Sequence, residues 1–266
     1  MLFIHIKNVI LIAFKKNHPS YYGPLTQLFK MAADQNNSDF YTHLLRSNSI
    51  FETTTKQSIS RLVADCTLKH LLKGEHTIDK ENNFYKFHFI IKGKIKVYNL
   101  NQSDKHFTLF ILSENDVFDV FTLINTVQHD VCYEILEDLE LLVISTDIMR
   151  TWLKNNPDTL SAFFKYTIQK FKLLESQILD IGTNTITARL ANLLLKYYNV
   201  KTCKIEDIDN LTHDELAQLI GTSRAVFNRH IQRLKKQGII DVSRKHIEIL
   251  NLPLLQKQSH TKDPYT

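Results

Sequence analysis

Cysteine is scarce in this chain. The 266 residues include three cysteines, Cys66, Cys132 and Cys203, which lie far apart in the sequence. Without a C-x-x-C pair they predict neither a disulfide framework nor a zinc or iron–sulfur ligand set. We therefore expect isolated, semi-buried thiols, as in a reducing cytoplasm, and a redox-sensing thiol is the alternative.

Catalytic motifs are missing as well. The six glycines form no phosphate-binding loop and no G-x-S-x-G motif, and no Ser/His/Asp or Cys/His arrangement is visible. Twelve histidines are present, but His88, His106 and His129 are too widely spaced for a metal site of the cupin kind. The sequence thus predicts no enzyme, no catalytic residue and no metal site. A cupin-like small-molecule-binding protein or enzyme with C-terminal interaction helices is the rival interpretation.

Long hydrophobic runs are also lacking. Lys7 interrupts the apolar residues of the segment 1–16, so the uninterrupted run is too short to span a membrane. Phe14, Lys15 and Lys16 follow the apolar stretch in place of a small-residue cleavage site, which argues against a signal peptide. Met31 offers a second start, and we expect residues 1–30 to be a mis-assigned upstream start or a loosely attached extension. A cytoplasmic protein with no membrane partner is predicted.

Acidic and basic residues are unevenly distributed. From Arg189 to the C-terminus there are 13 lysines and arginines against 8 acidic residues, whereas residues 31–188 hold 16 basic and 20 acidic residues. The formal net charge of the whole chain is only +5. A polyanionic partner is therefore expected for the C-terminal part alone.

The first half has the pattern of a β-rich domain. From about Leu62 to Ser145 short strand-like runs follow one another, and apolar and polar residues alternate from Tyr85 to Leu100 around Gly93. The further runs are Phe107–Leu112, Asp116–Phe121, Val131–Leu136 and Glu140–Ile144. This spacing is typical of an antiparallel roll, which we assign to residues 39–156, after an N-terminal extension at 1–38; the family resemblance given below implies that this roll is a sensory domain.

A long helix is predicted after the roll. Apolar residues recur there at alternating steps of three and four. They are Phe164, Thr167, Phe171, Leu174, Ile178 and Ile181. This seam predicts a dimerisation helix over residues 157–184, with a hinge near Gly182. Because the apolar stripe is wider than the seam, a helix packed on its own domain is the alternative. Helix is expected again over residues 185–198.

A helix-turn-helix pattern follows. Thr212 and Glu215 have the spacing of a capping box, which begins a helix, and Gly221 supplies the tight turn after it. Ser223 is expected to cap a second helix, which Gly238 ends. Two helices joined by so short a turn are typical of DNA-binding proteins.

The residues after this motif predict a wing. Residues 239–242 and 246–250 have the pattern of a β-hairpin, and the basic tip at Arg244 and Lys245 could reach a phosphate. Together with the preceding helices they form the winged helix-turn-helix domain that we assign to residues 185–266.

The second helix of the motif is basic and carries no acid. Arginine pairs with guanine O6 and N7, and asparagine with adenine N6 and N7, so such a helix can read bases in a major groove. The candidate DNA-binding residues are Thr212, Ser223, Arg224, Ala225, Asn228, Arg229, Arg233, Lys235, Arg244 and Lys245. The alternatives are a solvated basic face on a core helix and a DNA-architectural protein without sequence preference.

These parts together resemble the Crp/Fnr superfamily of transcription regulators over roughly Leu62–Leu255. The resemblance rests on the order of parts and on two motifs, R-L-A-x-L-L-L at Arg189–Leu195 and L-T-x-x-E-L-A-x-x-I-G-T-S-R at Leu211–Arg224. It implies an α+β fold with an antiparallel β-roll like the cyclic-nucleotide-binding jelly roll, a long dimerisation helix and a C-terminal winged helix-turn-helix. It also implies a homodimer that binds a palindromic operator in double-stranded DNA, contacts RNA polymerase and responds to an unknown small-molecule effector.

The same resemblance assigns roles on the second helix. It implies that Arg224, Asn228 and Arg229 contact bases. Ala225 stands where many members have a glutamate that reads cytosine. The target half-site is therefore expected to depart from the common one.

The front domain departs from the cyclic-nucleotide-binding members. Their phosphate-binding cassette corresponds to Phe118–Leu123, which has no glycine and no glutamate, and His129 stands where an arginine would hold the phosphate. The N-terminal cysteine cluster of the oxygen-sensing members is also absent. No cofactor is predicted, neither cyclic AMP nor an iron–sulfur cluster. The chain looks closer to the cofactor-poor members found in low-GC Gram-positive bacteria.

Overall fold

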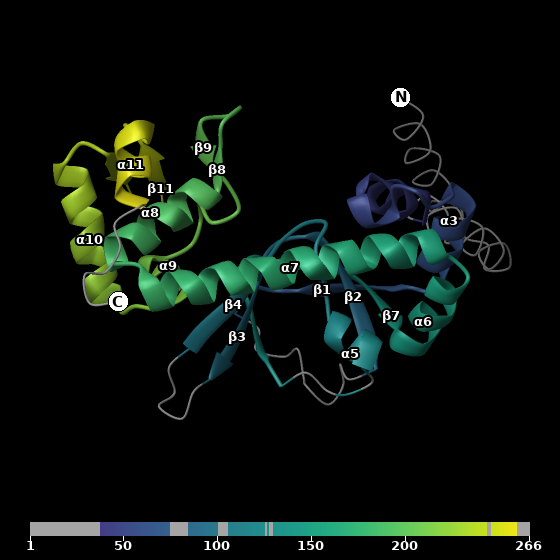
Figure 1. Ribbon diagram of the computed structural model, residues 1–266. Helices are drawn as coiled ribbons and strands as arrows, with labels where there is room; N and C mark the ends of the chain where they lie inside the picture. The colour runs from purple at the N-terminus through teal and green to yellow at the C-terminus, as the bar shows by residue number, and fades with distance from the viewer. Residues whose placement is uncertain are drawn as a thin grey trace, which may run out of the picture.

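The computed structural model describes residues 38–74, 85–100, 106–125, 127, 130–243 and 246–259. A β-rich domain and a helical domain are joined by one long helix, α7 (Pro157–Thr183), which runs along both (Figure 1). The expected α+β class, with a β-roll, a long helix and a winged helix-turn-helix in this order, is confirmed. The extension expected at residues 1–38 lies outside the described residues apart from its last one, and the other domain boundaries stay predictions.

Two antiparallel sheets form the roll. The first has the strand order β1–β7–β2–β5. These strands are Thr67–Leu71, Leu139–Ser145, Lys86–Lys92 and Val117–Phe118. The second sheet has the order β4–β3–β6, and its strands are His106–Leu112, Ile95–Leu100 and Cys132–Ile135. Strand β3 is central in this sheet because β4 and β6 pair with its two edges.

Strand β2 contributes to two hydrophobic cores. Its alternate residues Phe87, Phe89 and Ile91 pack with helices on one face of the sheet, while Ile90 packs between the two sheets. Because both faces of β2 are buried, residues 87–91 are almost all apolar. The helices on the first face are residues 38–47, η2 (Ser49–Phe51), α3 (Lys56–Ala64) and α6 (Thr146–Lys154).

Two expected strand segments are wrong. Leu62 lies in helix α3, which Thr55 caps, and not at the start of the β-rich region. The run expected at Asp116–Phe121 is a strand only at β5, and helix α5 (Val120–Asn125) follows at once. Asp119 between them takes a φ of +67°, a left-handed conformation that turns the chain out of the sheet. So short an apolar run cannot distinguish a two-residue strand from a helical turn.

Helix α7 is anchored to the roll at its beginning. It starts at Pro157, which suits a first turn because proline has no amide hydrogen to leave unpaired. Thr159 and Phe163 are its buried residues, and the Phe163 ring lies 5.5 Å from that of Phe87. Beyond this anchor the helix leaves the core of the roll, and at Asn184 the chain continues in an extended conformation.

The C-terminal domain packs four helices and two hairpins around one core. The helices are α8 (Ile186–Lys196), α9 (His213–Leu219), α10 (Arg224–Lys236) and α11 (Leu252–Ser259). The hairpins are β8–β9 (Tyr198–Asn199 and Lys204–Ile205) and the wing β10–β11 (Ile240–Ser243 and His246–Ile249). The core residues with no exposed surface are Leu190, Ala191, Leu194, Ala217, Phe227, Ile231, Leu234 and Leu255. Hairpin β8–β9 and helix α11 have no counterpart among the expected elements.

Candidate nucleic-acid interface

Helix α10 has one apolar and one basic face. Ser223 caps it by accepting a hydrogen bond from the Val226 amide at 3.4 Å. Phe227, Ile231 and Leu234 are fully buried, so helical spacing turns the opposite side outward. The exposed residues of the helix are Arg224, Ala225, Arg229, Gln232, Arg233, Lys235 and Lys236. In Figure 1 this helix lies at the far end of the C-terminal domain from the roll.

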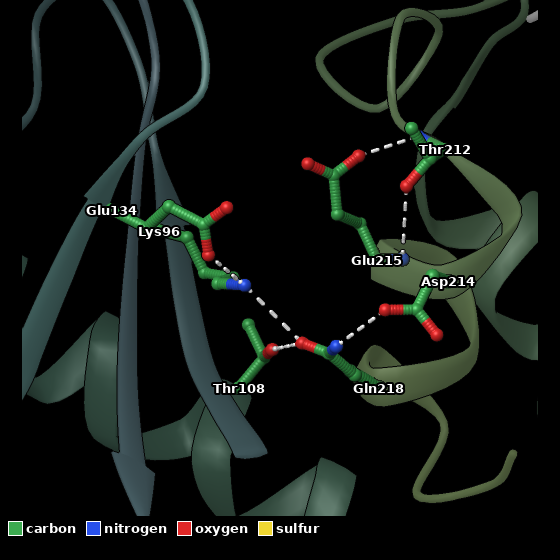
Figure 2. Close-up of polar contacts among 7 residues, drawn as sticks. All are labelled: Lys96, Thr108, Glu134, Thr212, Asp214, Glu215 and Gln218. Atoms are coloured by element: carbon green, nitrogen blue, oxygen red, sulfur yellow. Dashed lines mark hydrogen bonds and ion pairs between the residues drawn. The ribbon is translucent and has the colours of Figure 1, made fainter. Parts of the chain in front are cut away.

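The turn between α9 and α10 is built as the sequence predicts. Thr212 and Glu215 form the capping box, in which each side chain accepts a hydrogen bond from the other residue's amide (Figure 2). Gly221 has a φ of +64°, and a Cβ atom there would lie 3.1 Å from Cδ1 of Ile181. The turn thus contacts the end of α7. Thr212 is exposed, but its hydroxyl is engaged in the cap.

The wing is tied to the end of α10. Nζ of Lys235 lies 2.8 Å from Oδ1 of Asp241 and donates to the carbonyl oxygen of Val242 at 3.1 Å. The hydrogen bond from Lys235 lowers the pKa of the Asp241 carboxyl. Lys235 therefore positions the wing as well as adding charge. The expected phosphate contacts Arg244 and Lys245 lie outside the described residues.

Asn228 lies at the edge of the exposed side of α10. It is half-buried, and its Oδ1 atom is 2.6 Å from Nδ1 of His213, the first residue of α9. The ring of His213 stands 5.4 Å from that of Phe227. Sequence reasoning missed His213, because its contact with Asn228 joins two helices and leaves no local pattern.

The expected seam of α7 divides into two groups. Phe164, Phe171 and Ile178 are 48, 66 and 63 % exposed. The other three expected residues, Thr167, Leu174 and Ile181, are half-buried. Ile168 and Leu179 are also exposed, at 56 and 58 %. The helix therefore has an exposed apolar face. This face includes Ile168 and Leu179, which the expected seam lacks, and excludes the half-buried residues of that seam.

Thr167 and Leu174 of the half-buried group, together with Phe171, border a cavity of about 360 Å³ between the roll, α5 and α7. Its lining includes Phe118, Asp119 and Phe121 of the segment expected to correspond to the cyclic-nucleotide cassette, together with Thr167 and Leu174 of α7. The walls are largely apolar. His129, which we expect in place of the arginine of the cassette, lies outside the described residues.

Polar groups are few in this cavity. The carboxylate of Asp119 accepts a hydrogen bond from the Tyr133 hydroxyl at 2.5 Å and lies 2.9 Å from Nδ1 of the buried His88. Burial, followed by the charge of Asp119, raises the pKa of Tyr133 above its usual range. Lys170 is the one basic side chain among the described residues of the lining, and Asp116 holds its Nζ at 2.5 Å. The described residues also include no group of three or more His, Cys, Asp or Glu that could hold a metal ion.

A polar cluster joins the roll to α9 (Figure 2). Nζ of Lys96 on β3 pairs with Glu134 on β6 and lies 3.2 Å from Oε1 of Gln218 on α9. Thr108 on β4 donates to the same oxygen at 3.5 Å, and the Gln218 amide donates to Asp214 at 2.9 Å. The Lys96 side chain is only 2 % exposed. A charge buried this deeply needs partners, and Lys96 has one in each domain. We call these five residues the Lys96 cluster.

Further contacts surround the Lys96 cluster. Lys94 of the roll lies 3.1 Å from Asp209 of the C-terminal domain. The Gln177 amide on α7 donates to the carbonyl oxygens of Thr108 at 2.9 Å and of Leu219 at 3.1 Å. The roll, α7 and α9 therefore meet at one junction. Sequence reasoning missed this junction, since Lys96 and Gln218 are 122 residues apart in the chain.

Comparison with known proteins agrees with this geometry. Residues 188–258, from α8 into α11, match the family model of the Crp-like helix-turn-helix domain. The C-terminal domain is a Crp-like helix-turn-helix domain. The predicted resemblance to Crp/Fnr transcription regulators is thereby confirmed.

Relatives of the chain extend the likeness beyond the Crp-like domain. The chain is similar to the global nitrogen regulator of Synechocystis sp., at 25 % identity over 64 % of this chain and 79 % of the relative. It is also similar to the CRP-like cAMP-activated global transcriptional regulator of Mycobacterium tuberculosis, at 19 % identity over 81 % of this chain and 98 % of the relative. Both relatives are global regulators, and the second is a transcriptional one.

The solved structures show the same fold. A transcriptional regulator from Eubacterium rectale that is assigned to the Crp/Fnr family has a TM-score of 0.60 at 19 % identity, over 80 % of this chain and 98 % of that one. The chain therefore has a Crp/Fnr-like fold, in which the Crp-like domain follows a β-rich domain and a long helix. Within the part of the chain that the structure describes, no helix is long and apolar enough to cross a membrane.

Proposed function

We propose that this protein is a cytoplasmic, sequence-specific transcription regulator that binds a palindromic operator as a homodimer. The observation that carries the proposal is the outward basic face of α10 within the Crp-like domain. Arg224, Arg229 and Arg233 share this face, and its helix carries no acidic residue that would repel a phosphate backbone. A helix of this kind enters the major groove while α9 crosses the backbone.

The exposed face of α7 supports the homodimer. Phe164, Ile168, Phe171 and Ile178 leave a row of apolar side chains in water, which a second copy of the helix would cover. Two protomers related by a twofold axis would set their α10 helices about 34–36 Å apart, one turn of DNA. A symmetric protein of this kind requires an inverted repeat in its operator.

An effector bound in the roll would act through the junction with the C-terminal domain. The cavity beside α7 and the Lys96 cluster both border strands β3 and β4 of the second sheet. We therefore expect a ligand in the cavity to shift these strands and, with them, the Lys96 cluster. A small movement there would alter the separation of the two α10 helices and hence the affinity for DNA. The protein is proposed to work without a cofactor and to contact RNA polymerase at its promoters.

Selection of DNA fragments bound by the purified protein tests the proposal. We expect the enriched fragments to share an inverted repeat, and we expect a labelled fragment to withstand competition from random duplex at a stated salt concentration. Enrichment without any shared sequence, or equal competition by random duplex, would identify an architectural protein instead. Metal analysis of the same preparation addresses the cupin-like alternative, which would require a stoichiometric metal ion.

A further inference from the structure

We propose that His213 is a positioning residue for Asn228, and that this pair sets the base preference at one position of each DNA half-site. The inference rests on the proposed function, because it concerns how the Crp-like domain reads its operator. It assigns a role in specificity to α9, the helix that lies outside the groove in this binding mode.

Asn228 stands among the residues that face DNA. It follows Arg224 by four residues, so these two side chains are neighbours on the surface of α10, and Arg229 is the next residue of the helix. Unlike the two arginines, Asn228 is half-buried, because its amide meets Nδ1 of His213 at 2.6 Å. A carbonyl oxygen can only accept, so in this contact His213 carries its proton on Nδ1 and donates to Oδ1.

His213 is itself held in place. Its ring lies 5.4 Å from the ring of Phe227, which is fully buried. Its backbone follows Thr212, whose side chain caps α9. A narrow space beneath the wing is bordered by His213, Leu216 and Ile247. The ring of Phe227 and the capped start of α9 restrain the imidazole, and through Oδ1 the imidazole restrains the amide of Asn228.

Restraint of the amide matters for base recognition. The terminal torsion of an unrestrained asparagine is broad, whereas recognition of a base edge needs the amide in the plane of the base pair. Because Oδ1 accepts from His213, the orientation that exchanges Oδ1 and Nδ2 of the amide is disfavoured. The amino group and the second lone pair of Oδ1 then remain available to a base edge. Less conformational entropy is then lost on binding, which corresponds to roughly two- to tenfold in discrimination between bases.

The test compares full-length variants by selection from a randomised DNA library. We expect Asn228→Ala to abolish the preference at one position of each half-site. His213→Ala should weaken the preference at the same position by roughly two- to tenfold and leave the other positions unchanged. The double variant should match Asn228→Ala, because a positioning residue has no effect once its target is gone.

Two conservative variants separate positioning from a merely structural role. His213→Asn can place an amide nitrogen near the position of Nδ1 and should restore the preference, whereas His213→Gln extends further and should not. His43→Ala, an exposed histidine of the N-terminal helical segment, is the matched control and should leave every position unchanged. Circular dichroism of each variant confirms its fold before selection.

Several outcomes would overturn the proposal. An equal loss of affinity for all sequences in His213→Ala would identify a phosphate contact, and a change at a position other than that of Asn228 would remove the link between the two residues. If His213→Ala does not fold, equal base preferences in His213→Asn and His213→Gln would decide against the pair. Failure of the unchanged protein to enrich any inverted repeat would count against the proposed function instead.

Discussion

Replacement of Gln218 by alanine removes the C-terminal domain's part in the Lys96 cluster. Gln218 lies on α9, where alanine is at least as good a helix former, so the change should leave the helix itself intact. What is lost is the bond between its Oε1 and the buried Nζ of Lys96 at 3.2 Å. The variant therefore tests how strongly the roll holds the Crp-like domain.

The magnitude follows from the geometry of the cluster. A hydrogen bond to a charged group contributes about 1.5–3 kcal/mol. The bond from Thr108 to the same oxygen is 3.5 Å long and adds little. Lys96 keeps Glu134 as a partner, which is 33 % exposed and lets water approach. We therefore expect Gln218→Ala to lower the free energy of unfolding by about 1–2 kcal/mol, towards the lower end of the range for such bonds.

Urea denaturation provides the assay. Trp152, the single tryptophan, lies in α6 and reports on the roll by fluorescence, while far-ultraviolet circular dichroism reports on all the helices. A double-mutant cycle with Lys96→Met isolates the contact between the domains, and a coupling free energy of about 1 kcal/mol is expected. Gln232→Ala, an exposed glutamine on α10, is the control and should change stability by less than about 0.5 kcal/mol. A coupling below about 0.3 kcal/mol would refute the role assigned to the Lys96 cluster.

Three further predictions concern base reading, pH and thiol reactivity. Arg229→Ala should cost about 1–3 kcal/mol of binding free energy on the selected operator but little on random duplex in mobility-shift titrations, and equal losses on both would contradict base reading. Burial, followed by the charges of Arg233 and Arg229, lowers the pKa of His230. Its contribution to stability is therefore complete above the unfolded pKa of about 6.5 and is lost as pH falls through that value towards the folded pKa. The melting temperature should drop less between pH 7 and pH 5 in His230→Gln, and an unchanged drop would argue against this role. Burial and then Asp65 raise the pKa of Cys66 to about 12, so in the native protein Cys66 should react with a disulfide reagent far more slowly than the exposed Cys203. A fast phase that persists when Cys132 and Cys203 are both replaced by serine would contradict this assignment.

Elements fixed by local chemistry could be predicted from the sequence. The Thr212 capping box, the left-handed Gly221 and the Ser223 cap each depend on residues within one turn, and the structure has all three. Helix α7 was predictable because its apolar period continues over many residues. The segment around Asp119 was not, because a two-residue strand and a short helix share one brief apolar run.

Contacts between distant segments could not be predicted in this way. The partners of Lys96 and the neighbour of Asn228 are chosen by the packing of whole elements, so no spacing in the sequence marks them. Strand β3 gave no sign that Lys96 would be buried, because alternation alone places a lysine on the solvent face. Its burial arises only when the Crp-like domain covers the second sheet of the roll.

The most direct test of the account changes the distance between the two half-sites of the selected operator. Two α10 helices held by paired α7 helices must meet the major groove on the same side of the DNA. Insertion of about five base pairs at the centre, half a helical turn, should therefore reduce binding to the level of random duplex, and insertion of about ten should restore part of it. Equal binding to all three spacings would contradict the claim that a rigid dimer reads an inverted repeat.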